Sequence, residues 1–206
     1  MALLSKQEAD RIASAVEKAE SRTAGEIVVQ VVERSDDYAS VRWPLAFILG
    51  AVTAEALHWV PGASGFEVGV GGLVTIAALF ASQSSALVRA LVRRDQMEAA
   101  VHRRAKEAFI DNRVHRTRDA SGVLILLSQL EHRVEILADE GIHQRVGVEG
   151  WSRHVQTIVE GLKSGAPADG LERAIAAIGE ELAQTFPRRQ DDVNELPNAP
   201  VLGAGA

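Results

Sequence analysis

The sequence predicts an α/β protein: an α/β/α sandwich with a small mixed sheet and an inserted transmembrane helical hairpin. The stretch from Gly122 to Ile142 has the pattern of two strands joined by a tight turn. Amphipathic helical patterns precede and follow it, as expected for helices that cover a sheet. Two long apolar runs, 43–60 and 66–81, interrupt the chain after its first predicted strand.

The two central strands are expected to differ in burial. Residues 123–127 are apolar at every position, which is typical of a strand covered on both faces. Ser128 to His132 form a polar break, and residues 133–138 then mostly alternate polar and apolar side chains. The second strand is therefore expected nearer a sheet edge, where Arg133 and Glu135 reach water.

The composition excludes several classes of function. The 206 residues carry a net charge of -6 and no basic stripe with interleaved aromatics, so nucleic acid is not expected as a partner. The absence of cysteine excludes disulfides and thiolate chemistry. The first ten residues lack the basic and apolar pattern of a cleaved signal peptide, so none is expected.

A capped helix and a buried strand are predicted near the start of the chain. Ser5 and Glu8 fit the S-x-x-E capping box, in which each side chain satisfies a free backbone N–H. The helix that follows places apolar residues on one face: Leu4, Ile12, Val16 and Ala19. Residues 27–32 are β-branched except for Gln30, which predicts a buried strand.

The two apolar runs have the length and composition of a membrane hairpin. Each approaches the ~17 to 25 residues that a helix needs to cross a bilayer, and turn-forming residues 61–65 separate them. Trp43 and Trp59 would lie roughly 24 Å apart along a helix, one at each membrane interface. The second run is expected to leave the membrane as a helix that continues through residues 87–92.

A helical hairpin buried inside a soluble domain is the alternative interpretation. Glu55 and His58 favour it, because an isolated carboxylate in hydrocarbon is costly unless it is paired, neutral or next to another helix. Glu55 is only one turn from Trp59, however, and so close to the expected interface. The membrane interpretation is preferred.

Basic residues predict the orientation of the hairpin. The link between the two runs contains no Lys or Arg, whereas arginines flank the hairpin on both sides. They are Arg34, Arg42, Arg89, Arg93, Arg94, Arg103 and Arg104. By the positive-inside rule, we expect the inner (cytoplasmic) membrane as the location, with the soluble domain facing the cytoplasm.

Further helices complete the expected domain. Apolar stripes predict helices around 95–109, 148–162 and 169–186, and Pro187 ends the last of them. The expected organisation is a discontinuous α/β domain (1–40 and 95–187), a transmembrane helical hairpin (43–92) and an extended polar tail (188–206).

Several segments resemble the TPM domain, a family named for a thylakoid lumen protein, a photosystem II repair protein and a nematode receptor modulator. The matching pieces are residues 23–27 (TAGEI), 122–125 (GVLI) and 133–142 (RVEILADEGI). A bacterial membrane subgroup of the family is matched by Trp151, Gly170-Leu171, 186–187 (FP) and 194–197 (NELP). The resemblance covers most of the chain outside the apolar runs.

The resemblance implies an α/β/α domain, and a plant member of the family has been described as an acid phosphatase with a bound calcium ion. Many members face the lumen or the outside of the cell. The arginines of this chain instead place its domain in the cytoplasm, where calcium is scarce. This departure weakens the transfer of calcium binding to the chain.

Acids near the predicted strand ends are the candidates for chemistry. Asp36, Asp37 and Asp139 would converge if their strands ran side by side, and their oxygens would suit calcium or magnesium. Such an ion could hold a phosphate. Further candidates are Glu26, Arg133 and Glu140, with Arg133 as a phosphate-binding residue.

The preferred alternative is that these residues are structural. Asp36 and Asp37 would then form a solvated turn, and Asp139 would cap the next helix. The histidines are scattered without a close ligand pair, and no serine has the G-x-S-x-G context. No catalytic residue is assigned.

Two functions from different classes remain. The preferred one is a non-enzymatic, membrane-anchored TPM-like domain that binds or stabilises other membrane proteins, because no activated nucleophile or base is recognisable. The other is a weak divalent-metal-dependent phosphatase, supported by the family resemblance and the acids. The expected partners are the lipid bilayer and an unidentified membrane protein, and a homo-oligomer is left open.

Overall fold

The chain forms two compact units. The computed structural model describes residues 4–62 and 65–203, and the side chains of 143–149 lie outside the described part. The first unit, called the α/β unit, consists of Met1–Asp36 and Glu98–Ala206. The second, called the hairpin unit, consists of Asp37–Met97.

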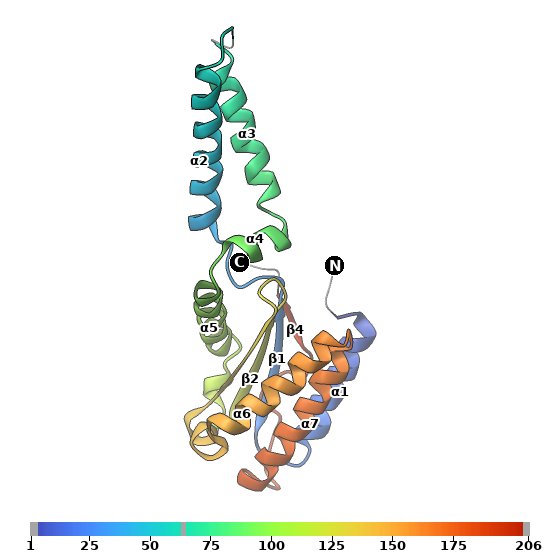
Figure 1. Ribbon diagram of the computed structural model, residues 1–206. Coiled ribbons are helices and arrows are strands. Elements are labelled where there is room, and N and C mark those ends of the chain that lie inside the picture. The colour runs from blue at the N-terminus through green and yellow to red at the C-terminus, as the bar shows by residue number, and fades with distance from the viewer. Residues whose placement is uncertain (1–3, 63–64, 204–206) are drawn as a thin grey trace. The chain divides into compact units, whose positions relative to one another are not determined.

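A four-stranded mixed sheet lies at the centre of the α/β unit, with the strand order β3-β2-β1-β4 (Figure 1). The strands are β1 (Glu26–Val32), β2 (Gly122–Ser128), β3 (Arg133–Ala138) and β4 (Val201–Gly203). β1 pairs in parallel with both β2 and β4, whereas β2 and β3 are antiparallel. The predicted α/β class and small mixed sheet are confirmed. β2 is buried throughout and β3 is an edge strand, as their sequence patterns predict.

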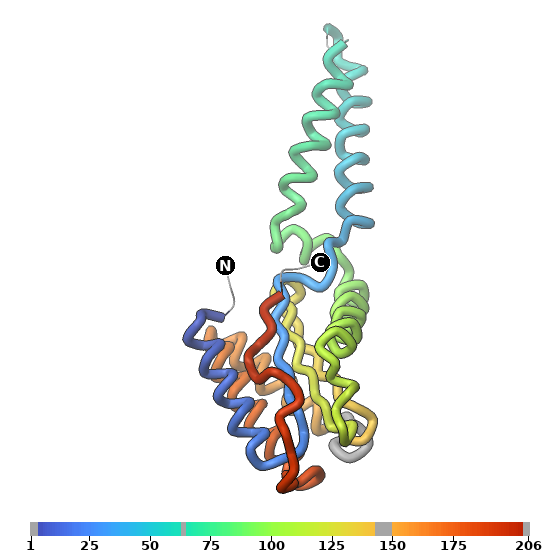
Figure 2. The backbone as a smooth tube through the Cα atoms, turned by 180° about the vertical axis from the view of Figure 1, so that it is seen from behind, coloured from blue at the N-terminus to red at the C-terminus, as the bar shows by residue number. Residues whose placement is uncertain are grey.

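Helices cover both faces of this sheet (Figures 1 and 2). One face carries α1 (Lys6–Glu20), α6 (Glu140–Lys163) and α7 (Pro167–Thr185). The other carries α5 (Arg94–Asp111) and the 3-10 helix η1 (Val114–Arg116). Adjacent strand residues point to opposite faces, so Val29 packs with α1 and α7 while Val28 packs with α5.

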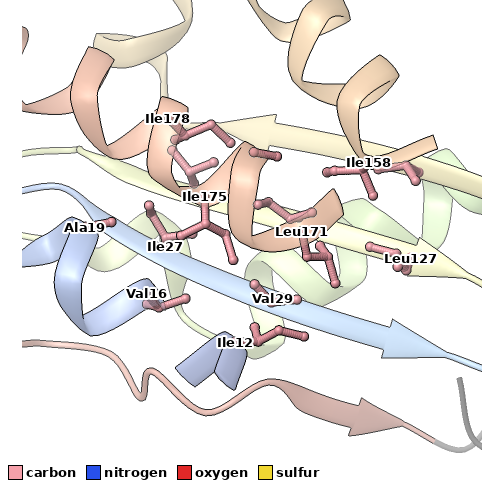
Figure 3. Packing of buried hydrophobic residues seen from close by; sticks show 14 of the residues in the cluster. Ile12, Val16, Ala19, Ile27, Val29, Leu127, Ile158, Leu171, Ile175 and Ile178 are labelled. Carbon is pink, nitrogen blue, oxygen red and sulfur yellow. The ribbon is translucent and has the colours of Figure 1, made fainter. Parts of the chain in front are cut away.

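The larger core lies between the sheet and the three-helix layer. Figure 3 shows Ile12 and Val16 of α1 directed toward Ile27 and Val29 of β1, with Ile175 of α7 against the same strand. All five side chains are buried. Each fully buried residue of this size contributes about 1.5–3 kcal/mol through the hydrophobic effect, so this layer is the main stabilising contact of the unit.

The helix starts differ in how well the sequence predicts them. The capping box of α1 is confirmed: the Ser5 hydroxyl accepts from the Glu8 N–H at 3.2 Å, and Glu8 accepts from the Ser5 N–H at 2.8 Å. The predicted 148–162 helix is longer than expected, because α6 already begins after Asp139. The predicted contribution of Val148 to its apolar stripe lies outside the described side chains.

Three helices lie wholly within the hairpin unit: α2 (Ala39–His58), α3 (Glu67–Ala81) and α4 (Ser85–Leu91). The prediction that the second apolar run continues as one helix is wrong, because α3 and α4 are bent by 100° at a short break. The break contains Ser82, whose hydroxyl donates to the Leu79 carbonyl at 2.7 Å. Ser82 is the C-cap residue at which α3 ends.

The segment after Pro187 is ordered by the sheet. It was expected to be an extended polar tail, but its residues 201–203 form β4 on the edge of β1. Leu196 and Val201 also pack against the core on the α5 face. The expectation of a tail is wrong for residues 201–203. The edge of β1 offers backbone N–H and C=O groups, and these can pair with a strand whatever side chains that strand carries.

One helix in the described ranges is long and apolar enough to cross a membrane alone, and this helix is α2. The α3 and α4 pair passes the same test only when its two bent parts are taken together. The transmembrane assignment therefore stays a prediction.

Candidate functional site at the start of the first strand

Two buried carboxylates lie together where β1 begins. Glu26 is the first residue of β1 and is 5% exposed, and Glu20 is the last residue of α1 and is 9% exposed. They line a pocket of about 210 Å³ in the α/β unit. The other lining residues are Glu17, Ser21, Thr23, Arg188, Asp192, Asn194 and Asn198. The candidate Glu26 is thus part of an acidic pocket.

A tight turn brings these two acids together. The Thr23 hydroxyl donates to the Phe186 carbonyl at 2.7 Å and accepts from the Gly25 N–H at 3.0 Å, which fixes the chain between α1 and β1. Gly25 packs closely on α7, because an added Cβ would lie 2.9 Å from Leu182 Cδ1. The TAGEI segment therefore acts as a rigid connection between helix and strand.

The carboxyl groups of Glu20 and Glu26 both accept hydrogen bonds from backbone N–H groups. Glu26 accepts from the N–H groups of Glu195 at 3.1 Å and Leu196 at 3.2 Å, which ties the start of β1 to the segment before β4. Glu20 accepts from the Ile27 N–H at 2.8 Å. These bonds satisfy buried donors, and this is a structural task.

Burial changes the ionisation of the pair. Desolvation raises the pKa of Glu20 to about 8, with the hydrogen bond from Ile27 opposing the shift and the nearby Glu26 charge adding to it. Desolvation also raises the pKa of Glu26, and its two backbone hydrogen bonds oppose that change. Glu20 is therefore mostly protonated at pH 7 and acts as a neutral hydrogen-bonding group there.

The predicted convergence of the three aspartates does not form. Asp36 follows the carboxyl end of β1 and pairs with Arg103. Asp139 follows β3, which runs antiparallel to β2, and its N–H donates to the Gly122 carbonyl at the opposite end of the sheet. Asp37 belongs to the hairpin unit, where its carboxylate accepts from the Ala39 N–H at 2.9 Å.

The other candidates have local partners as well. Asp139 caps α6, since its carboxylate accepts from the Glu140 N–H at 2.8 Å, as the structural interpretation predicts. Glu140 itself is exposed in the first turn of that helix. Arg133 is half-buried and donates to Glu98 of α5 at 2.6 Å, so its charge is already paired.

The described side chains do not form a site that fits a calcium or magnesium ion. Among residues with described side chains, no group of three or more histidine, aspartate or glutamate residues is arranged to hold a metal. Glu20 and Glu26 line one pocket, but each already accepts a backbone hydrogen bond. A divalent cation binds deprotonated carboxylates whose oxygens are free to coordinate it.

A second buried polar cluster lies at the carboxyl end of β1. The Glu131 carboxylate accepts from the Ser35 N–H at 3.0 Å and from the Ser128 hydroxyl. The Ser35 and Ser128 hydroxyl oxygens are 2.7 Å apart. These bonds fix the loop after β1 to the turn between β2 and β3, and so have a structural role.

Sequence reasoning missed Glu20 and the pocket residues of the last segment. Glu20 ends an amphipathic helix and looks like a solvated charge, because nothing in its neighbourhood marks it as buried. The last segment did carry a signal. Residues 194–197 (NELP) resemble a motif of the TPM family, although the rest of the segment is polar. Its backbone supplies the two donors to Glu26.

The comparisons with known proteins agree with this architecture. A model of the TPM domain matches residues 74–181, a span that includes β2, β3 and most of α7. The chain belongs to the TPM domain family. This TPM-domain protein gave no match in the comparison with curated proteins.

A solved structure supports the fold of the TPM-domain protein. The NMR structure of the BA42 protein from the psychrophilic bacterium Bizionia argentinensis aligns with a TM-score of 0.62 over 97% of this chain and 95% of that chain. The two sequences are 22% identical. At this identity the likeness shows the fold alone.

Proposed function

We propose that this TPM-domain protein is a membrane-anchored, non-enzymatic binding protein. In the proposal, α2 and α3 form the anchor, and the α/β unit binds or stabilises other membrane proteins from the cytoplasmic side. One observation carries it: both hairpin helices expose large apolar side chains. Among them are Phe47, Ile48, Val52, Leu73, Ile76 and Phe80.

The exposure of the hairpin is too extensive for an ordinary soluble surface. Phe47 is 57% exposed and Phe80 is 71% exposed, and only 11% of the apolar window of α2 is buried. Large contiguous apolar surfaces on monomers mark contact with a membrane or a partner. Lipid would cover every outward-facing side of the hairpin, whereas a single protein partner would cover one side.

The helix lengths favour an anchor with one long and one short arm. The 20 residues of α2 span roughly 30 Å, which matches the hydrocarbon core of a bilayer. The 15 residues of α3 span roughly 22 Å and fall short of it. The bend before α4 would place this third helix along the interface rather than across the hydrocarbon.

Polar side chains within the hairpin are compatible with lipid because they have partners. The Trp59 indole N–H donates to the Glu55 carboxylate at 3.1 Å. The Thr53 and Thr75 hydroxyls donate to backbone carbonyls of their own helices at 2.8 and 3.0 Å. The pairing of Glu55 weakens the main argument for a soluble hairpin.

Cysteine labelling in intact cells would test both the anchor and its orientation. The chain has no cysteine, so Gly62→Cys in the link and Ser14→Cys in α1 each give one labelling site. We expect a membrane-impermeant maleimide to label the first variant and to spare the second until the cells are opened. Extraction of the protein by alkaline carbonate would contradict the anchor, and the reverse labelling pattern would contradict the orientation.

A groove between α1 and α7 is the surface that best suits protein binding. It has a volume of about 750 Å³ and is lined by charges of both signs. These are Asp10, Arg11, Lys18, Arg22, Glu172 and Glu180. Arg11 bridges to Asp169 at 2.7 Å and to Glu172 at 2.8 Å, which holds the two helices in register. Mixed charge over a rigid scaffold favours specific polar recognition.

Photo-crosslinking would test this groove. A photoreactive amino acid at Ser14, inside the groove, is expected to crosslink a discrete membrane protein in cells. The same amino acid at Gln156, an exposed position on α6 outside the groove, is the matched control. Equal crosslinking from both positions, or none from Ser14, would count against the binding function.

A further inference from the structure

The hairpin unit contains an apolar pocket whose lining residues include one charged residue. Its volume is about 270 Å³, and it is bounded by α2, α3 and α4. The lining residues are Arg42, Leu45, Ala46, Leu49, Ala78, Ala81, Leu87 and Leu91. Arg42 is the one polar residue among these eight, and the surface of the pocket is almost entirely apolar.

The bend between α3 and α4 shapes this pocket. Because α4 turns by 100°, its residues Leu87 and Leu91 form a wall beside Ala78 and Ala81 of α3. A straight continuation of α3 would carry these leucines away from the small residues. The pocket therefore depends on the break that the sequence analysis did not predict.

Arg42 is held in place without losing its charge to an acid. Its Nε donates to the Ser82 hydroxyl at 3.0 Å, and its Nη1 donates to the Asp37 carbonyl at 3.1 Å. Both acceptors are neutral oxygens, and no carboxylate in the described part of the chain forms an ion pair with this guanidinium. The guanidinium is thus held by two neutral oxygens, and its positive charge stays available to an anion.

The arginines of the hairpin unit lie away from the link between α2 and α3, in the same parts of the sequence as Asp37 and Asp95. Arg42 precedes the apolar part of α2, and three further arginines, at 89, 93 and 94, follow α3. Glu55 and Glu67 lie instead beside the link between α2 and α3. Trp43 stacks with Phe47 at a ring-centroid distance of 6.0 Å, next to Arg42, as expected for an interfacial aromatic residue.

We propose that this pocket binds an anionic phospholipid, with an acyl chain against its leucines and the phosphate on Arg42. The inference rests on the proposed membrane anchor, because the arginine-bearing end of the hairpin then faces the leaflet that carries anionic lipids. An apolar pocket and an arginine that has no ion-pair partner among the described residues match an amphiphile with a negatively charged head. The lipid would hold α4 against the hairpin.

Native mass spectrometry on the reconstituted full chain would test the site. The protein is placed in vesicles of phosphatidylcholine alone or mixed with phosphatidylglycerol, and the lipid retained on the released protein is identified. We expect phosphatidylglycerol to be retained preferentially by the natural sequence. Arg42→Gln should reduce that preference about fivefold, because the variant removes one specific ion pair with the lipid phosphate at the protein surface.

Two matched controls separate a specific site from general effects. Arg94→Gln removes the same charge from an exposed position that does not line the pocket, and should keep the preference. Ala81→Leu fills the pocket and should lose retained lipid, whereas Ala77→Leu, exposed on the same helix outside the pocket, should not.

The possible failures are distinguishable. Equal loss in the two arginine variants, or normal retention in Ala81→Leu, would overturn the lipid site while leaving the anchor intact. Retention of both lipids in equal amounts would do the same. A protein that fails to enter vesicles of either composition would overturn the membrane anchor and, with it, the lipid site.

Discussion

At the scale of single residues, Glu26 joins the first strand to the segment that precedes the last strand. Its two carboxylate oxygens accept from consecutive backbone N–H groups, of Glu195 and Leu196. Hydrogen bonds to a charged or partly charged group contribute about 1.5–3 kcal/mol, and a buried N–H without a partner is destabilising. Glu26 is therefore expected to control whether β4 stays on the sheet.

Removal of the Glu26 carboxylate should release β4. In Glu26→Ala, we expect the backbone amides of residues 201–203 to exchange hydrogen at least about tenfold faster, because one charge-assisted bond is worth more than 1.4 kcal/mol. Hydrogen exchange read by mass spectrometry measures this. Glu33→Ala, at an exposed position just after β1, is the control. Unchanged protection of β4 in Glu26→Ala would contradict the role of this residue.

Glu20 makes stability depend on pH. Its pKa rises from 4.5 to about 8 on folding, so the folded chain keeps a proton that the unfolded chain has already released. The free energy of unfolding should therefore decrease as pH rises from 4.5 to about 8, and then level off. The full pKa shift of Glu20 corresponds to about 5 kcal/mol of unfolding free energy. Because the carboxyl group lines a surface pocket, solvent screening should reduce this decrease to about 2 kcal/mol.

Glu20→Gln should flatten this pH dependence and stabilise the protein at pH 8. Denaturation can be followed by the fluorescence of Trp151, which is buried in the α/β unit. Trp43→Phe and Trp59→Phe remove the other two tryptophans, so the signal reports this unit alone. Glu17→Gln, an exposed neighbour on α1, should keep the slope. An identical slope in both glutamine variants would exclude Glu20 as its source.

At the scale of elements, α2 and α3 approach closely at a pair of glycines. A Cβ added to Gly50 would lie 1.9 Å from Thr75 Oγ1, and one added to Gly71 would lie 2.7 Å from the Gly50 carbonyl oxygen. Gly72, on the next position of α3, has open space around it. Small residues at one contact let helix backbones pack closely in a membrane-type hairpin.

A large side chain at the glycine contact should separate the two helices. In Gly71→Leu, we expect the distance between α2 and α3 to increase by roughly 2 Å, because helix spacing follows the side chains at the contact. Spin labels on cysteines introduced at Ile48 and Leu73, both exposed, report this distance in a chain without native cysteine. Gly72→Leu should leave it unchanged, and an equal shift in both variants would contradict the glycine contact.

Local patterns predicted the elements better than their mutual arrangement. β2 and β3 follow from their apolar runs and the polar turn between them, and the capping box marks the start of α1. The predicted convergence of Asp36, Asp37 and Asp139 depended, in addition, on the relative directions of β1 and β3. The short turn makes β3 antiparallel, and this reversal places Asp139 at the opposite end of the sheet from Asp36.

β4 shows a different limit of sequence reasoning. Its three residues have no alternating pattern, and the free edge of β1 determines that they form a strand. The bend before α4 is also not evident from the sequence. The pattern is apolar on both sides of residues 82–84, so it predicts one continuous helix. Glu20 became a buried acid only through packing of segments distant in sequence.

At the scale of the whole molecule, the hairpin unit is an insertion between two paired strands. β1 and β2 are parallel neighbours, although residues 37–97 lie between them in the chain. The core of the α/β unit draws on buried residues from both of its segments. This division predicts that the α/β unit can fold without the insertion.

Replacement of residues 37–97 by a flexible linker of about eight glycine and serine residues should give a folded protein. We expect cooperative thermal unfolding and dispersed amide resonances in a two-dimensional nitrogen–proton spectrum. A variant that also carries Leu124→Asp, in the centre of β2, is the unfolded control. Resonances of the linked unit that coincide with this control would show that the hairpin unit is needed for folding.

The insertion also sets the order of events during synthesis. A ribosome releases β1 long before β2, because the entire hairpin unit is made between them. The apolar β1 therefore stays unpaired until β2 has been synthesised. Unpaired strand edges favour aggregation in this state. If the hairpin enters a bilayer as it emerges, the growing chain is tethered there while β1 is still unpaired. Membrane targeting would then act on this protein as a safeguard during its own biogenesis, before any role for the finished molecule.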